Sequence, residues 1–468
     1  EHLPAAGVHS WADVEDVLPC SPMQQGILIS QLKAPTTYRV TQTCRVRTTD
    51  SALPVDVARL EGAWRCLVAR HTILRTVFIE SLPNQQGFFQ LVLGSPQAHV
   101  VRLECEEGTG PQACVAAQAA LEYCSGTLPH RFTVVTTAAG DVYCHLEVSH
   151  ALVDASSIEL LIRELLEAYD GRLADGPAPR YSAYVAFLQK RPANEDLRYW
   201  EDLLADAEPC HLPRLDPGPG AAAEAEHATP ATVSAQLKNL AALAELRERH
   251  GLTLANLFQL AWALVLAART GSDQVCFGYL SSGRDAAIPG APELVGPMIN
   301  MMTCYFHVER GMTVLDAARA VQDRFLKGFE HQRTPLADVQ HALRLSRQPL
   351  FNTTVSYKRK AAASPDALPR SIALESLASE DPTEYEVGVT VVAGKDAVDV
   401  ALQYSPGLLS AASAEDLLAQ LVSTLDSLSR RPHARLGELS QLSGRDVAKI
   451  RAWNGSAPAR SERCLHDL

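Results

Sequence analysis

A strand-like segment that ends in a histidine and leads straight into a helical segment is the feature that most constrains this chain. Residues 143–148 alternate polar and apolar side chains, as a half-buried strand does. His150 follows the strand, Asp154 stands four residues later, and a Ser-x-x-Glu capping pattern begins at Ser156. Apolar residues then recur at helical spacing as far as Tyr169. The sequence therefore predicts a strand–turn–helix unit with an imidazole and a carboxylate in its turn.

This unit offers acid–base chemistry. A neutral imidazole can accept a proton from an attacking nucleophile, and its pKa near neutrality suits that task. A carboxylate nearby can orient the loop or pair with a base. The chain has 15 histidines, and a His-x-x-x-Asp pair is frequent by chance, so the sequence around His150 has to support the assignment.

The remaining chain interleaves strands and helices without a strict βαβ order. This pattern predicts an α/β fold built as an α+β sandwich. Because 468 residues exceed what one hydrophobic core usually holds, we expect two lobes of roughly 200 residues each. Further helices are predicted at residues 57–69, 237–250, 254–268 and 414–428, and further strands at residues 275–280, 351–357, 385–392 and 398–404.

Composition excludes several classes of partner. The chain is 47% hydrophobic and 21% charged, as ordinary globular proteins are. Its net charge is -12 and its Lys and Arg residues are dispersed, which argues against nucleic acid. The longest apolar run, around residues 260–268, is shorter than the roughly 20 residues of a spanning helix, so we expect no membrane. The 11 cysteines include no Cys-x-x-Cys, which predicts reduced thiols in a cytoplasmic protein and no metal site.

Residues 149–155, Ser-His-Ala-Leu-Val-Asp-Ala, resemble the His-His-x-x-x-Asp-Gly motif of nonribosomal peptide synthetase condensation domains. Several more segments resemble signatures of that family, in the family's order, and together they cover nearly the whole chain. They are residues 18–26, 70–78, 273–278, 282–284, 294–300, 331–336 and 349–352. One such match arises easily by chance, whereas an ordered series does not. The chain is thus identified as a member of that family, in a fungal-type variant of the motif.

The resemblance implies an architecture. Two chloramphenicol-acetyltransferase-like lobes would form a V, with a central tunnel and His150 at its middle. Residues 1–175 would form the N-terminal lobe that carries the motif, and residues 176–438 the C-terminal lobe. Residues 439–468 resemble a linker and the start of a following adenylation domain.

The resemblance also implies a reaction. A donor acyl or peptidyl thioester would be joined to the amine of an aminoacyl thioester, forming an amide. Both substrates would be carried on 4'-phosphopantetheine arms of upstream and downstream peptidyl carrier domains, so no intrinsically bound cofactor is expected. His150 would be the catalytic residue, acting either as a base or as a positioning group.

Other residues receive roles by the same resemblance. Asp154 would pair with Arg75 and fix the loop. Ser149 stands where the family has its first histidine, and Ala155 stands where it has glycine. Asn352 and Tyr169 are candidate tunnel or motif residues, although Tyr169 also fits the apolar stripe of its helix.

Several alternatives stay open at this point. Tyr169, 14 residues after Ala155, also fits the pattern of fungal terminal condensation domains that release products by macrocyclisation. A non-catalytic docking domain would share the fold, as would epimerase relatives. A coenzyme A acyltransferase would carry an Asp-Phe-Gly-Trp-Gly motif, which is missing. The adenylation-like tail favours chain elongation.

Overall fold

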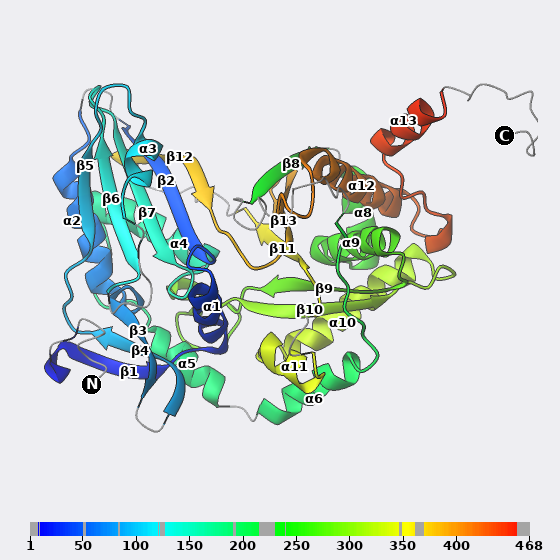
Figure 1. Ribbon diagram of the computed structural model, residues 1–468, viewed down its shortest axis with the longest axis horizontal. Helices are drawn as coiled ribbons and strands as arrows, with labels where there is room; N and C mark the ends of the chain where they lie inside the picture. The colour runs from blue at the N-terminus through cyan, green and yellow to red at the C-terminus, as the bar shows by residue number, and fades with distance from the viewer. Residues whose placement is uncertain are drawn as a thin grey trace, which may run out of the picture.

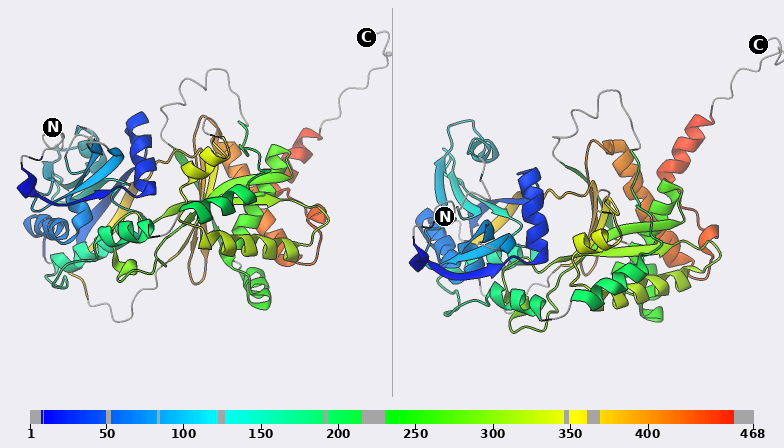
Figure 2. Two further views of the ribbon diagram at one scale, coloured as in Figure 1. Left: turned by 90° about the horizontal axis from the view of Figure 1, so that it is seen from below. Right: turned by 60° about the horizontal axis from the view of Figure 1, so that its bottom comes forward.

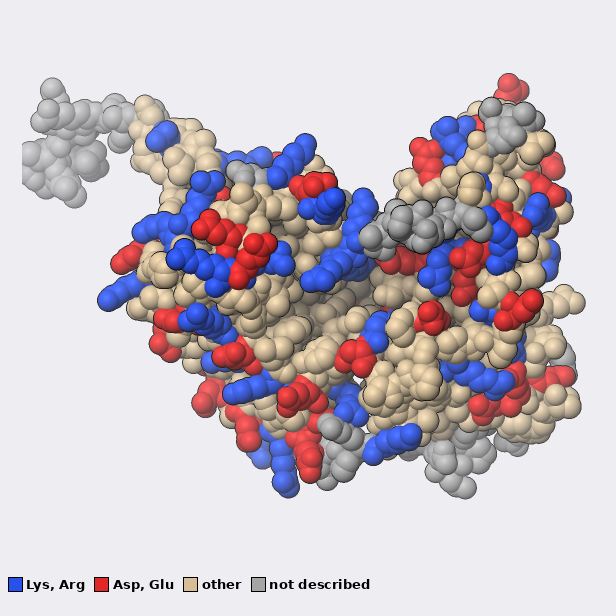
Figure 3. Space-filling view, turned by 180° about the vertical axis from the view of Figure 1, so that it is seen from behind, with Lys and Arg blue, Asp and Glu red and all other residues tan. Residues whose placement is uncertain are grey.

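Two lobes lie side by side in the computed structural model (Figures 1 and 2). It describes residues 8–455, except residues 9, 50–52, 83–84, 120, 122–126, 191–192, 215–229, 239, 346–348 and 361–368. Seen from behind, the surface is hollowed between the lobes, which gives the predicted V outline (Figure 3). The predicted mixed α/β fold is confirmed.

The first lobe contains two sheets. A five-stranded sheet has the order β12–β2–β7–β6–β5, and a three-stranded antiparallel sheet has the order β1–β4–β3. In the larger sheet only the β5–β6 pair is parallel. The strands are β1 (Val14–Pro19), β2 (Arg39–Thr48), β3 (Thr76–Leu82), β4 (Gln85–Leu93), β5 (Val100–Glu104), β6 (His130–Thr136), β7 (Val142–Ser149) and β12 (Ile372–Glu380).

The second lobe is built on one mixed sheet of order β10–β9–β11–β13–β14–β8. Strand β11 is parallel to both of its neighbours, and the other pairs are antiparallel. The strands are β8 (Ala231–Leu237), β9 (Gln274–Ser281), β10 (Asn300–His307), β11 (Thr353–Arg359), β13 (Val387–Ala393) and β14 (Val398–Tyr404).

Helices cover these sheets, and each lobe has its own core. In the first lobe α2 and α4 pack together on the large sheet, where Trp64 stacks on Phe132 with ring centroids 4.9 Å apart. In the second lobe α9 is buried along most of its length between the sheet and the neighbouring helices α10 and α12. The helices are α1 (Pro22–Lys33), α2 (Val57–Arg70), α3 (Pro111–Ala116), α4 (Ala155–Tyr169), α5 (Tyr181–Gln189), α6 (Ala193–Leu203), α8 (Ala241–His250), α9 (Leu254–Thr270), α10 (Val314–Glu330), α11 (Leu336–Ala342), α12 (Ala411–Arg430) and α13 (Gly444–Trp453).

Segments from beyond residue 175 complete the first lobe. Strand β12 pairs with β2 along eight register positions and forms one edge of the five-stranded sheet (Figure 1). Tyr181 and Tyr184 of α5, together with Leu294 and Met298, belong to the core of the same lobe. The first lobe is therefore not formed by one continuous stretch of the sequence.

Local sequence patterns predicted the types of the elements better than they predicted the burial or the exact ends of the elements. Strand β7 is buried on both faces rather than half-buried, and its Glu147 is ion-paired with the buried Arg131 of the neighbouring strand β6. Residues 237–250 do not form one helix, because β8 continues to Leu237 and α8 begins at Ala241. Among the described residues, no single helix is long and apolar enough to cross a membrane, and α8 with α9 reaches that length only as a pair bent by 110°.

The cysteines differ from expectation at one place. Cys105 and Cys114 form a disulfide, so the prediction that all thiols are reduced is wrong for this pair. The two residues are separated by nine positions, and the chain turns back so that the Cα atom of Cys114, within α3, lies 6.1 Å from that of Cys105. That separation lies within the range a disulfide can span. The sequence contained no signal for this return of the chain.

The tail after residue 438 contains α13, which is fastened to α12. Asp416 of α12 accepts from Arg445 at 3.1 Å and also pairs with Lys449. The adenylation-like residues 462–468 lie outside the described part of the chain. The division at residue 439 therefore stays a prediction.

Candidate functional site

His150 lies directly after β7, where its backbone is bonded to a residue that immediately precedes the neighbouring strand β2. Its backbone N–H donates to the carbonyl of Tyr38 at 2.9 Å. Tyr38 has a φ of 59°, in the left-handed region that non-glycine residues seldom adopt. His150 is 6% exposed, so its ring position is determined by the packing around it.

The ring of His150 meets one acidic and one aromatic side chain. Its Nε2 lies 3.7 Å from Oδ2 of Asp381, in the segment after β12. The ring of Tyr38 is edge-on to it, with centroids 6.0 Å apart. Burial, with smaller contributions from Tyr385 and nearby carboxylates, raises the pKa of Tyr38 well above its usual value, so the phenol is neutral at physiological pH. The imidazole Nδ1 is buried without a hydrogen bond to any described residue.

Ser149, which stands in the place of a histidine, ties the turn to α1. Its buried hydroxyl donates to Oε1 of Gln31 at 3.1 Å and accepts from the N–H of Ala151 at 3.2 Å. Gln31 also donates to the carbonyl of Tyr38 at 3.1 Å. The side chain of Gln31 thus contacts both Ser149, which precedes His150, and Tyr38, whose carbonyl accepts from the His150 backbone.

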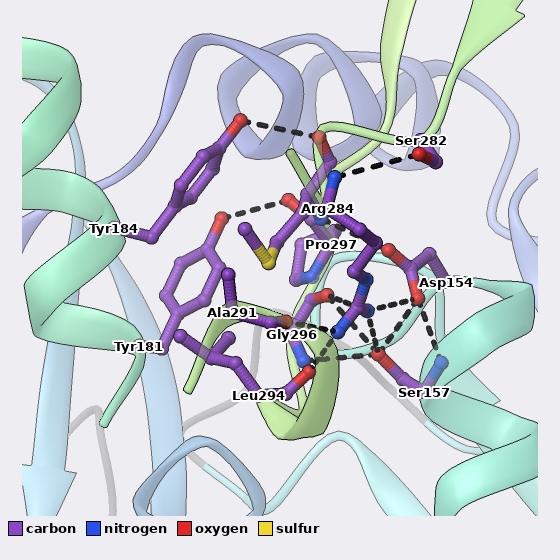
Figure 4. Close-up of polar contacts among 11 residues, drawn as sticks. Asp154, Ser157, Tyr181, Tyr184, Ser282, Arg284, Ala291, Leu294, Gly296 and Pro297 are labelled. Atoms are coloured by element: carbon purple, nitrogen blue, oxygen red, sulfur yellow. Dashed lines mark hydrogen bonds and ion pairs between the residues drawn. The ribbon is translucent and has the colours of Figure 1, made fainter. Parts of the chain in front are cut away.

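Asp154 is saturated with hydrogen bonds at the start of α4 (Figure 4). Its Oδ1 accepts from the backbone N–H and the hydroxyl of Ser157, each at 2.8 Å, which makes Asp154 the N-cap. The same oxygen accepts from Arg284 at 2.7 Å, and Oδ2 accepts from the backbone N–H of Met298 at 3.0 Å. The N-cap is therefore Asp154, two residues before the Ser156 that the capping pattern in the sequence suggested.

The predicted pairing of Asp154 with Arg75 is wrong. Arg75 donates to Glu15 at 2.7 Å and to the backbone carbonyls of Gly94 and Leu93, beside the β1–β4 sheet. The hydrogen bond that Arg75 donates is the largest cause of the lowered pKa of the Glu15 carboxyl group. Arg284 is the partner of Asp154 instead, and it comes from a segment whose resemblance to the family was noted without a role.

The loop of residues 282–298 is fixed against the first lobe by tyrosine hydroxyls and glycines. Tyr181 donates to the carbonyl of Pro297 at 2.9 Å, and Tyr184 donates to that of Met298 at 3.1 Å. Gly283 and Gly296 have φ values of +62° and +154°. A Cβ on Gly283 would lie 2.1 Å from a backbone oxygen, and one on Gly296 would lie 2.2 Å from the ring of Tyr181. Only glycine fits these two positions without rearrangement.

Three other predicted residues lie in separate surroundings. Ala155 is the first residue of α4, beside Asp154. Tyr169, at the other end of that helix, is 4% exposed and accepts from the N–H of Asp56 at 2.9 Å. It belongs to the first core, as its place in the apolar stripe suggested. Asn352 accepts from the N–H of Leu212 at 2.8 Å and joins backbone segments in the second lobe.

A cavity of about 610 Å³ lies between α5, the 282–298 loop and the end of α10. Tyr184, Met298, Asn300 and Arg333 are among the residues that line it. His150 does not, so the predicted tunnel centred on His150 stays a prediction. In the described part of the chain, no three His, Cys, Asp or Glu side chains are grouped so that they could hold a metal ion.

The sequence did not identify several residues that shape this site. Gln31 and Tyr38 precede the motif by more than 100 positions, and Asp381 follows it by more than 200. Nothing in their local sequence marks them. Tyr38 and Asp381 are brought near His150 by the pairing of β2 with β7 and β12, and Gln31 by the place of α1 beside the turn. The N-cap role of Asp154 could have been found, since aspartate is a preferred N-cap residue whose side chain accepts from a backbone N–H two or three residues later, here that of Ser157.

Comparisons with known proteins match the chain over nearly its whole length. A family model described as the condensation domain matches residues 14–450. Nonribosomal peptide synthetase 32 of Fusarium pseudograminearum is 45% identical over the whole chain, and nonribosomal peptide synthetase vlms of a Lecanicillium species is 44% identical over 99% of it. The chain spans 5% of the length of each of these two relatives.

Solved structures share the fold at low identity. The condensation domain from the monacolin K polyketide synthase MokA is 18% identical with a TM-score of 0.74, and the alignment covers 91% of this chain and 100% of that one. The X-domain solved in complex with OxyB from teicoplanin biosynthesis is 21% identical with a TM-score of 0.75, over 91% of this chain and 96% of that one.

Proposed function

The chain belongs to the condensation-domain family found in fungal nonribosomal peptide synthetases, and we propose that it forms an amide bond during chain elongation. The substrates would be a donor acyl or peptidyl thioester and the amine of an aminoacyl thioester. Each would be delivered on the phosphopantetheine arm of a carrier domain, and an adenylation domain would follow in the same synthetase. The observation that carries the proposal is the buried His150 imidazole, held at the end of β7 beside an acidic residue from the far part of the chain.

The reaction mainly requires that the two substrates are held in the correct orientation and that one proton is transferred. The amine nitrogen attacks the thioester carbonyl, the C–N bond forms, and the C–S bond breaks. Orienting two reactants can lower the barrier by about 7–11 kcal/mol. His150 would take the proton from the amine and return it to the leaving sulfur, a contribution of about 10²–10⁴ in rate. The reaction needs no group that changes oxidation state.

The fastening of the turn supports this role. His150 is anchored through Tyr38 and Ser149 on one side and follows a strand that is buried on both faces. Asp154 and Arg284 secure the start of α4 and so fix the other end of the turn. A ring supported in this way can be placed against a reacting atom without first losing conformational freedom.

A reconstituted transfer assay tests the proposal. A donor-loaded upstream carrier is mixed with the chain and an aminoacylated downstream carrier, and intact-protein mass spectrometry follows both carriers. A donor–acceptor adduct on the downstream carrier supports elongation. His150→Ala should lower the single-turnover rate by about 10²–10⁴. His99→Ala, at an exposed histidine directly before β5, serves as the control for loss of an imidazole elsewhere in the first lobe.

The other outcomes separate the alternatives. A free cyclic product without any acceptor would favour the macrocyclising release function. Tyr169, which contributed to that hypothesis, is a core residue that hydrogen bonds to the N-cap of α2. No transfer by a well-folded chain with several donors would favour a non-catalytic docking domain. Full activity of His150→Ala would contradict the assignment of His150.

A further inference from the structure

We propose that Asp381 is a positioning residue for His150, and that it stabilises the imidazolium formed when the ring takes the proton of the amine. The inference rests on the amide-forming function proposed above. Its basis is that the carboxylate within the sequence motif serves another purpose, whereas a carboxylate from more than 200 residues away lies at the ring.

Asp154 is committed elsewhere. Four donors from Ser157, Arg284 and Met298 occupy its two oxygens, and the guanidinium of Arg284 compensates its charge. Its side chain is 1% exposed, so it cannot turn to a new partner without breaking this network. Among the contacts of the described residues, none joins Asp154 to His150. The motif therefore supplies the imidazole but not the carboxylate that acts with it.

Asp381 is placed where such a carboxylate is needed. Its Oδ2 lies 3.7 Å from Nε2 of His150. This separation exceeds a direct hydrogen bond of about 2.7–3.2 Å, so the two groups interact electrostatically until one of them moves by about 0.5 Å. The Asp381 side chain is 48% exposed, so solvent reaches the carboxylate while the ring beside it is buried.

The segment that carries Asp381 is fastened to the same residue that holds His150. The carbonyl of Pro382 accepts from the N–H of Tyr38 at 2.6 Å, while the carbonyl of Tyr38 accepts from His150 at 2.9 Å. Ser30 of α1 donates to Glu384 at 2.9 Å and attaches the segment a second time. Tyr38 thus links the acid and the imidazole through its two backbone groups, which sets their separation before any substrate binds.

In the proposed step the proton is transferred from the amine to His150 and then to the leaving sulfur. It leaves the amine nitrogen as the C–N bond forms, resides on Nε2 of His150, and passes to the thiolate as the C–S bond breaks. Asp381 takes no proton in this path, and its carboxylate lowers the energy of the intermediate cation. Other polar groups near the ring are poorly suited to this task, because Tyr38 is a neutral phenol, Glu384 accepts from Ser30, and Asp154 is paired with Arg284.

Replacement of Asp381 by asparagine tests the inference with two readouts. The first is the pKa of the His150 imidazole, followed by NMR on histidine-labelled protein and assigned with His150→Ala. Loss of the neighbouring negative charge should lower this pKa by about 0.5 unit, as expected for a pair that is partly exposed. The second is the single-turnover rate against pH, in which the limb that requires neutral His150 should move to lower pH by the same amount.

Two further variants separate this effect from general ones. Asp381→Glu keeps the charge and should hold the pKa of His150 closer to that of the unaltered chain than Asp381→Asn does. Glu380→Gln removes another exposed charge one residue away and should leave the pKa of His150 unchanged. An unchanged pKa in Asp381→Asn, or an equal shift in Glu380→Gln, would overturn the inference. Because the NMR titration needs no turnover, it decides the role of Asp381 even if the unaltered chain transfers no donor, a result that would count against the proposed function alone.

Discussion

Replacing Arg284 by methionine should destabilise the first lobe strongly, because it leaves a buried carboxylate without its counter-charge. The side chain of Asp154 is 1% exposed and that of Arg284 is 12% exposed, so solvent cannot compensate the loss. Breaking one side of such a pair costs about 3–5 kcal/mol. A cooperative unit of about 200 residues has an unfolding entropy of about 0.4 kcal/mol/K. The midpoint of thermal unfolding should therefore fall by about 7–12 °C.

A double-mutant cycle identifies the partner. Calorimetry would compare Asp154→Asn, Arg284→Met and the two together, and then the same cycle with Arg75→Met. Asp154 and Arg284 share a hydrogen bond, so their effects should deviate from additivity by about 0.5–3 kcal/mol. Asp154 and Arg75 share no bond partner among the described residues, so their effects should add to within about 0.5 kcal/mol.

Arg75→Met is an informative comparison because it also removes a half-buried ion pair, with Glu15. Lower stability in this variant alone is expected and decides nothing. Coupling of Asp154 to Arg75 instead of Arg284, or an unaltered midpoint in Arg284→Met, would refute the reasoning. Hydrogen exchange of the 282–298 loop adds a local readout, and its amides should exchange faster in Arg284→Met.

Three further predictions concern stability and use the unfolding midpoint as the readout. Gly296→Ala should lower it by several degrees because the added Cβ meets the ring of Tyr181, whereas Gly26→Ala, with open space around it, should not; equal effects would contradict the packing. Burial lowers the pKa of His130 to about 4, while an unfolded histidine titrates near 6.5. The unfolded chain then binds the proton more readily, so stability should be complete above about pH 6.5 and decline as the pH falls towards 4. His130→Asn should flatten that decline, and a slope that persists would assign it to other groups. Tyr169→Phe should cost about 0.5–1.5 kcal/mol through its lost hydrogen bond and leave transfer unchanged; a loss of transfer in folded protein would return this residue to the reacting centre.

The strand–turn–helix unit around His150 was predictable because its determinants are local. Period-two alternation indicated β7, and an apolar stripe at helical spacing indicated α4. The two-lobe mixed α/β fold followed from length, interleaved patterns and the series of motifs. The position of His150 could be predicted from the end of β7 and the start of α4 alone.

The side chains that contact Asp154 and His150 could not be predicted from local sequence in the same way. A guanidinium for Asp154 was expected, but the choice between Arg75 and Arg284 depends on how the 282–298 loop packs against α4. Asp381 depends on a strand pairing across more than 300 residues. Alternation within residues 372–380 is weak, because most of β12 is exposed at the edge of the sheet. Such contacts are set by tertiary packing and leave little trace in local sequence.

The place of β12 has a consequence for recombining synthetases. An exchange of N-terminal lobes between two such chains that cuts only near residue 175 would join a foreign β2 to a resident β12, and would place a foreign histidine beside a resident aspartate. Mismatched edges and side chains of that kind would give hybrids that fold poorly or transfer slowly. A recombination unit that preserves these contacts would therefore be discontinuous. It would take α5, the 282–298 loop and residues 372–386 together with the residues up to about 175.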